Sequence, residues 1–192
     1  FKSEELDRCI RIPLDEPPGA ELDEILHLIA SYPETYLNTG HVSVAEAMRV
    51  VDLAQQYGIK NVLVASSVTK IATLDELRAM AAKGAFIEYT LAAYTHTTSI
   101  PKTHYYVEKE YAAMDEGMGA HPKGGIKLVA DQIMELGPQY CIIASDFGVY
   151  TLPDPVEGLR EFIACLLDLG VPADEVRTMV KRNPERLLGR NG

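Results

Sequence analysis

Polar side chains with catalytic chemistry stand in or directly after several short apolar runs of this sequence. They are His41, Ser66, Ser67, Glu88 and Asp146. A histidine and an aspartate at the ends of different strands can share one metal ion, because imidazole nitrogen and carboxylate oxygen are both common ligands. The spacing therefore predicts a metal site formed by His41 and Asp146, with Ser66, Ser67 and Glu88 lining it.

Purely structural roles also explain why these residue types occur at these positions. The metal-site interpretation and the structural interpretation therefore both stay open at this point. A histidine after a strand is often a polar neighbour of a helix N-cap, and Asp146 in Ser-Asp-Phe-Gly also suits a cap or turn. Three further histidines are spaced 8 and 17 positions apart and match no local metal motif: His96, His104 and His121. We interpret these three as surface or loop residues.

Helices and strands alternate along the chain. Apolar runs predict strands over residues 35–39, 61–65, 85–90 and 139–144. Apolar periodicity predicts helices over residues 21–31 and 126–136. Start signals predict the other helices: capping boxes at Ser43 to Glu46 and Thr73 to Glu76, an N-cap at Asp154 followed by Pro155 and a capping-box Glu157, and prolines at Pro172 and Pro184.

This order favours a parallel sheet. Consecutive parallel strands need crossover connections, which the intervening helices provide. A β/α barrel and a doubly wound sheet both satisfy the pattern. No GxGxxG or GxxxxGK[ST] motif follows a strand, which weakens the nucleotide-binding version of the open sheet.

Charge, length and cysteine content exclude several classes. The 192 residues carry 18 Lys and Arg against 28 Asp and Glu, a net charge of −10, which disfavours nucleic acid as a partner. No apolar run is long enough to cross a membrane. Three cysteines without CxxC spacing favour a reducing cytoplasm. A complete eight-stranded β/α barrel usually needs about 250 residues, so we expect an incomplete barrel, and the absence of an initial Met suggests a fragment or a trimmed chain.

Motifs spread over residues 34–190 resemble one known superfamily. The segments lie at 36–43, 46–47, 62–66, 84–88, 145–148 and 183–189, the last reading Asn-Pro-Glu-Arg-Leu-Leu-Gly. Together they resemble the amidohydrolase superfamily, and within it the uncharacterised amidohydrolase-related branch whose strand-five motif reads Thr-Gly-His. The resemblance covers the second half of that family's barrel.

The resemblance implies a metal-dependent hydrolase with a (β/α)8 barrel of the TIM type. By position, His41 resembles the metal ligand of strand five. Asp146 resembles the aspartate of strand eight, which in the family binds metal and accepts the proton of the attacking water. Zinc is the expected ion. Two features depart from the family: the chain has no His-x-His pair, and Ser66-Ser67 stands where strand six usually carries a histidine.

We therefore expect residues 1–192 to form one α/β barrel domain that is the C-terminal part of a barrel, with strands five to eight at about residues 34–148. The first hypothesis is a cytoplasmic hydrolase acting on an amide, ester or related bond of a small-molecule substrate. The alternative is a catalytically degenerate amidohydrolase-fold protein that binds a small ligand or partner at the barrel mouth. Open edge strands predict either a homo-oligomer or completion by an N-terminal segment.

Overall fold

A four-stranded parallel sheet forms the centre of the protein in the computed structural model, which describes residues 11–15, 17–94, 125–148 and 152–190. The strands follow the chain in the order β1-β2-β3-β4, and each pairs in parallel with the next. Their bounds are β1 (Leu37–Asn38), β2 (Val62–Val64), β3 (Phe86–Thr90) and β4 (Cys141–Ala144). The predicted α/β class with parallel strands is confirmed.

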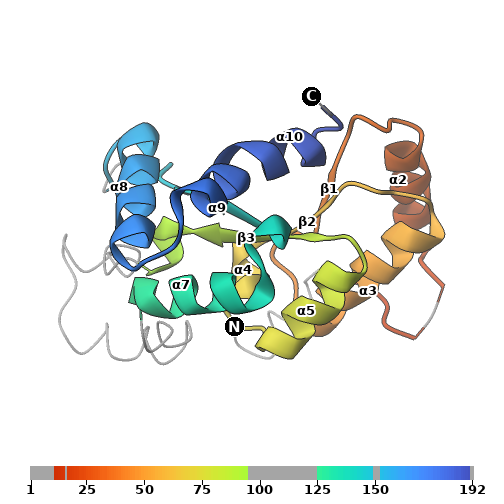
Figure 1. The fold of residues 1–192 in the computed structure, drawn as a ribbon. Helices are drawn as coiled ribbons and strands as arrows, with labels where there is room; N and C mark the ends of the chain where they lie inside the picture. The colour runs from red at the N-terminus through yellow and green to blue at the C-terminus, as the bar shows by residue number, and fades with distance from the viewer. Residues whose placement is uncertain (1–10, 16, 95–124, 149–151, 191–192) are drawn as a thin grey trace, which may run out of the picture.

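Helices connect and cover these strands (Figure 1). The α-helices are α2 (Ala20–Ala30), α3 (Val44–Gln56), α4 (Ser66–Thr69), α5 (Leu74–Ala82), α7 (Gly125–Leu136), α8 (Pro155–Asp168), α9 (Ala173–Arg177) and α10 (Asn183–Leu187). Shorter turns of other types are the 3-10 helices η1 (Leu91–Tyr94) and η3 (Pro138–Tyr140) and the π-helical segment η4 (Thr178–Arg182). Among the described residues, no helix is long and apolar enough to cross a bilayer.

Both predicted capping boxes are present at the helix starts. The Ser43 hydroxyl accepts a hydrogen bond from the Glu46 amide at 3.3 Å, and the Glu46 carboxylate accepts one from the Ser43 amide at 2.9 Å. Thr73 and Glu76 repeat this exchange at the start of α5, at 3.3 and 2.7 Å. Each box satisfies amides that the first helical turn leaves unpaired, which explains why α3 and α5 begin where the sequence predicts.

The start of α8 differs in one detail from its prediction. Asp154 caps the helix by accepting a hydrogen bond from the Val156 amide at 2.9 Å, and Pro155 occupies the first turn as predicted. The Glu157 carboxylate instead pairs with Arg160 one turn along. An exposed arginine three residues away gives the glutamate an i,i+3 partner, and this contact replaces the expected capping box.

The two helices predicted to start at Pro172 and Pro184 form one continuous helical run. Residues 173–177, 178–182 and 183–187 are α-helical, π-helical and α-helical in turn. Pro184 has no N–H group and its ring crowds the carbonyl four residues earlier. Both predicted helices are present, with Pro172 capping α9 and Pro184 in the first turn of α10. The wider π-helical segment between them joins the two into one run without a break at the proline.

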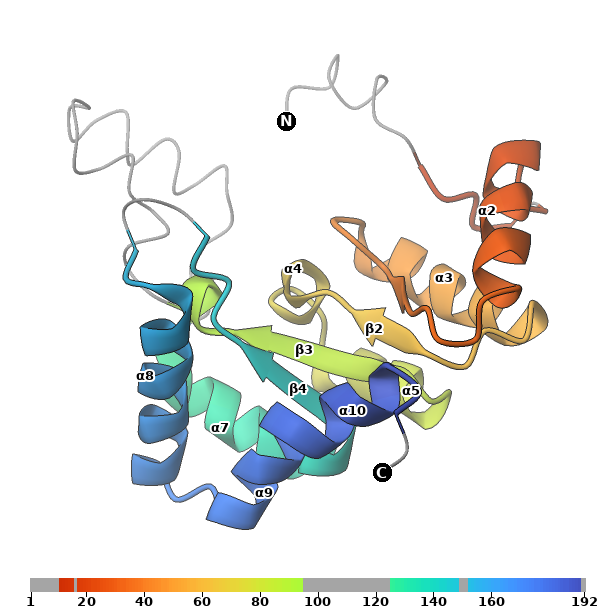
Figure 2. The same cartoon turned by 90° about the horizontal axis from the view of Figure 1, so that it is seen from above.

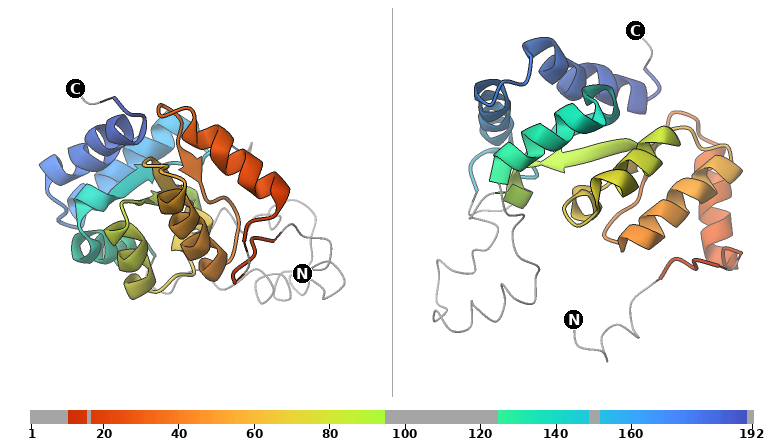
Figure 3. Two further views of the ribbon diagram at one scale, coloured as in Figure 1. Left: turned by 90° about the vertical axis from the view of Figure 1, so that its right-hand side faces the viewer. Right: turned by 60° about the horizontal axis from the view of Figure 1, so that its bottom comes forward.

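The two faces of the sheet are covered differently. Along β3, Ile87 and Tyr89 face the large core made with α3, α5 and α7, whereas Phe86 joins a small cluster with Leu63, Ile142 and Leu187. Figure 3 shows α3, α5 and α7 side by side across the first face. In the described part of the chain, the connecting helices α3, α5 and α7 therefore lie on the same side of the sheet, as in a singly wound sheet.

The end of the chain covers part of the second face (Figure 2). Leu187 of α10 packs in the small cluster, and Asn183 is fully buried beside β4. The Asn183 amide group donates to the carbonyls of Pro138 at 2.8 Å and Cys141 at 2.7 Å. Two residues of the Asn-Pro-Glu-Arg-Leu-Leu-Gly segment thus attach the last helical run to the sheet.

Candidate functional site

The carboxyl ends of the four strands lie at one end of the sheet, because all four strands are parallel. His41 follows β1, Ser66 and Ser67 follow β2, Glu88 lies within β3, and Asp146 follows β4. The structure therefore brings the five predicted residues to the same end of the sheet. It also separates two of them: β1 and β4 are the outer strands, three interstrand spacings or about 14 Å apart along the sheet.

Glu88 is the enclosed carboxylate of this group, since Asp146 is exposed. It is half-buried in β3 and lies on the same face as Phe86, since side chains alternate along a strand. Its carboxylate accepts a hydrogen bond from the Ser66 amide at 3.2 Å. Burial raises the pKa of Glu88; the Ser66 hydrogen bond lowers it, and the negative charge of Asp146 raises it again. Glu88 can therefore hold a proton at a higher pH than an ordinary glutamate.

The two serines link neighbouring strand ends. Ser66 begins α4, and its amide is the donor to Glu88. The Ser67 hydroxyl donates to the Gly40 carbonyl at 3.3 Å, which ties α4 to the turn after β1. These bonds give both serines a structural role and hold the ends of β1, β2 and β3 together.

His41 lies in the turn between β1 and α3. Gly40 adopts a left-handed φ of 68° there, and its amide donates to the Asn38 side chain at 2.8 Å. The His41 ring is exposed, and within the described residues it has no hydrogen-bond partner. The turn places the imidazole at the carboxyl end of the sheet, but no hydrogen bond from the described residues fixes the orientation of the ring.

The turn that contains Asp146 is fixed by the next residue, Phe147. It is exposed and has a φ of 56°, the left-handed region that non-glycine residues seldom occupy. The next residue, Phe147, is only 3% exposed and packs against Gly158 of α8. The anchored ring therefore fixes the turn that presents Asp146, and the strained backbone at this position is of the kind that functional sites often retain.

Thr90 is a site residue that the sequence analysis did not single out. It is 2% exposed, and its hydroxyl oxygen has no hydrogen-bond partner among the described residues. Alternation places Thr90 on the same face as Glu88, one step closer to the carboxyl end of β3. Polar residues at alternate positions, Glu88 and Thr90, in an otherwise apolar strand were the available signal.

Among the described cysteines, the one in the sheet, Cys141, adds no nucleophile to the carboxyl end of the strands. Cys141 and Cys165 are both free thiols. Cys141 lies at the start of β4, and burial raises the pKa of its thiol to about 12. A thiol in that state stays protonated near neutral pH and is unreactive.

Two of the described residues carry side chains of the kind that ligate a divalent ion. Imidazole from His41 and carboxylate from Asp146 are suitable ligands for zinc, so the donor chemistry fits a divalent ion. Their strands, however, lie at opposite edges of the sheet, and no group of three or more His, Cys, Asp or Glu side chains gathers within the described residues. His96, His104 and His121 lie outside these residues. A complete site needs ligands beyond the ones described.

Comparison with known proteins gives one family likeness. Residues 15–88 match a family described as a family of unknown function (DUF6282). The matched segment runs from before α2 into β3 and contains His41, Ser66, Ser67 and Glu88, whereas Asp146 lies beyond it. No curated protein matches the sequence.

Proposed function

We propose that this chain forms part of a hydrolase of the amidohydrolase type, with β1 to β4 as four consecutive strands of a β/α barrel. The supporting observation is the sheet itself: four parallel strands in sequential order whose packed connecting helices, α3, α5 and α7, share one face. A doubly wound sheet places its connecting helices on both faces, whereas a barrel keeps its connecting helices outside. The last helix α10, whose Leu187 packs on the other face, does not connect two of the described strands. On this proposal the face with Leu63, Phe86 and Glu88 lines the barrel interior.

The carboxyl end of the sheet is then the catalytic end, as in other β/α barrels. A divalent ion, with zinc the favoured one, would be held by His41 and Asp146 together with further ligands, and when bound it would lower the pKa of a water molecule. Asp146 accepts the proton from the attacking water. The substrate is a small molecule with an amide, ester or related bond.

Glu88 suits the second proton transfer of such a reaction. Its raised pKa and half-buried position let it hold a proton near the leaving group, and the Ser66 amide orients its carboxylate. Exposed Asp146 and enclosed Glu88 thus have different environments, which is how two carboxyl groups in one site take the roles of base and acid.

The test combines metal content with activity. Protein purified without chelator is analysed for bound metal, and its hydrolysis of a panel of amides and esters is compared with that of His41→Ala and Asp146→Asn. We expect bound divalent metal and a loss of activity of about 100-fold or more in each variant. Full activity in both variants would contradict the roles assigned to His41 and Asp146. An active protein that contains no metal would contradict the proposed metal dependence.

A second candidate is a degenerate member of the same fold that binds a small ligand at the barrel mouth without turnover. The observation that favours it is the role of the two serines: Ser66 and Ser67 bond to Glu88 and Gly40, and neither is a good zinc ligand. A ligand that binds wild type and Asp146→Asn equally, and is recovered unchanged, would support this candidate over the hydrolase.

A further inference from the structure

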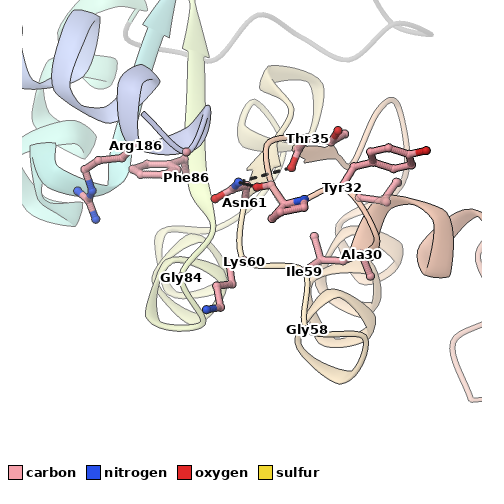
Figure 4. Close-up of a pocket in the computed structure, with 13 residues that line it drawn as sticks. Ala30, Tyr32, Thr35, Gly58, Ile59, Lys60, Asn61, Gly84, Phe86 and Arg186 are labelled. Carbon is pink, nitrogen blue, oxygen red and sulfur yellow. Dashed lines mark hydrogen bonds between the residues drawn. The ribbon is translucent and has the colours of Figure 1, made fainter. Parts of the chain in front are cut away.

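A pocket lies at the opposite end of the sheet from the candidate catalytic site. It has a volume of about 410 Å³ and is formed where β2 and β3 begin, between the end of α2 and α10. Lys60 and Asn61 directly precede β2, Phe86 begins β3, and Arg186 comes from α10 (Figure 4). The size falls within the usual range for small-molecule sites.

The charge of this pocket is opposite to that of the chain. The protein carries a net charge of −10, yet the described residues that line the pocket include Lys60 and Arg186 and no aspartate or glutamate. Both cationic side chains run toward the lower left of the view in Figure 4. Two positive charges without an acidic neighbour on the pocket wall create a local potential that favours an anion.

Neither cation is neutralised by a carboxylate in the described part of the chain. Arg186 donates to the Gln139 carbonyl at 3.5 Å and to the Asn183 side-chain oxygen at 3.3 Å, both neutral acceptors at long range. Its guanidinium also lies 5.2 Å from the centre of the Phe86 ring. This stacking orients the planar guanidinium and leaves hydrogen-bond donors for an oxyanion, which arginine binds through a fork of N–H groups.

Part of the remaining wall is apolar, beside the polar residues Tyr32 and Thr35. Ile59 and Phe86 contribute apolar surface, and Ile29 and Ala30 extend it from α2. The Asn61 amide group is already used, because it donates to the Pro33 carbonyl at 2.9 Å and thereby holds the α2–β1 connection beside β2. The pocket therefore combines a cationic end with an apolar wall held in place by its own hydrogen bond.

We propose that this pocket binds a small organic anion with a phosphate or carboxylate head and an apolar body. Arg186 and Lys60 contact the head, and Phe86 and Ile59 contact the body. The site is separate from the proposed catalytic end of the sheet, so it stands whether or not the protein is a hydrolase.

The test is a calorimetric titration of the full chain at low ionic strength with phenyl phosphate, inorganic phosphate and benzyl alcohol as probes. We expect phenyl phosphate to bind most tightly, inorganic phosphate to bind more weakly because it lacks the apolar body, and benzyl alcohol not to bind. Equal affinity for phenyl phosphate and inorganic phosphate would overturn the role of the apolar wall. Binding of benzyl alcohol as tight as that of phenyl phosphate would overturn the anion site.

Variants assign the binding to this pocket. Lys60→Gln and Arg186→Gln are each expected to weaken phenyl phosphate binding by about tenfold or more. Lys127→Gln is the matched control and should bind as wild type does, because this lysine pairs with Asp131 on the exposed surface of α7 and does not line the pocket. Lys60 is exposed, and within the described residues its side chain makes no hydrogen bond or ion pair. Unchanged binding in Lys60→Gln, or no binding in wild type, would therefore overturn the proposal.

Discussion

The ring of Phe147 lies so close to Gly158 of α8 that a Cβ at position 158 would be 2.2 Å from the ring carbon Cδ2. No side chain fits there without moving the ring. Since Phe147 directly follows Asp146, the glycine in α8 controls where the candidate base lies. Gly158, eleven positions after Phe147, therefore helps to shape the site although it has no reactive group.

Gly158→Ala is expected to lower the free energy of unfolding by about 1–2 kcal/mol, because overpacking of the Phe147 ring outweighs the better helix propensity of alanine. Chemical denaturation of both proteins measures the change. Phe147→Leu in the Gly158→Ala background provides the control, since a smaller side chain should recover part of the loss. An unchanged or higher stability of Gly158→Ala would contradict the proposed contact.

Glu88→Gln is expected to make the protein more stable at neutral pH. The pKa of Glu88 is raised in the folded state, chiefly by burial, so the folded state favours the protonated carboxyl. That contribution is fully present below the ordinary pKa of 4.5 and is lost as the pH rises through the higher folded-state pKa. Glutamine is never charged and its side-chain oxygen can still accept from Ser66.

The measurement is the free energy of unfolding of wild type and Glu88→Gln as a function of pH. The variant should exceed wild type at neutral pH, and the difference should disappear as the pH falls below 4.5. Glu24→Gln, at an exposed position of α2, serves as the comparison for loss of an exposed carboxylate. A gap between wild type and Glu88→Gln that widens toward low pH would show that the folded-state pKa is lowered instead.

Asn183→Ala is expected to be among the more destabilising single substitutions in the last helical run, by about 2–4 kcal/mol. The change leaves the buried carbonyls of Pro138 and Cys141 without their donor and opens a cavity beside β4. Thermal unfolding measures it. Asn183→Asp keeps the shape but replaces the donor with an acceptor, so it should be at least as destabilising; a mild effect of Asn183→Asp would argue against the two hydrogen bonds.

Local signals predicted the elements well because their causes are local. The capping boxes at Ser43 and Thr73 each involve residues three apart, so the sequence contains the whole interaction. The apolar runs likewise predicted four strands, and the described residues contain a sheet of four. The continuous helical run through Pro184 was missed because its π-helical segment has no sequence signal.

The arrangement of the candidate site depends on contacts that no spacing reveals. Gly158 lies eleven residues after Phe147, and Asn183 bonds to Cys141 over 42 positions. The pairing of His41 with Asp146 was inferred from strand ends alone, but the strand order places them at opposite edges of the sheet. Glu88 was predicted as a lining residue, while its hydrogen bond to Ser66 and its raised pKa came from the fold.

Substitutions at Asp146 should separate backbone strain from chemistry. Its φ of 56° suits glycine and penalises residues with a Cβ, so Asp146→Gly should be more stable than Asp146→Ala by about 1 kcal/mol, with Asp146→Asn close to wild type. All three variants lack the carboxylate, and all three should therefore lack hydrolase activity if Asp146 is the base. Chemical denaturation gives the stability order and the substrate panel gives the activity. If Asp146→Ala is more stable than Asp146→Gly, the turn does not need the left-handed backbone conformation. If the stable variant Asp146→Asn keeps its activity, the catalytic base is another residue.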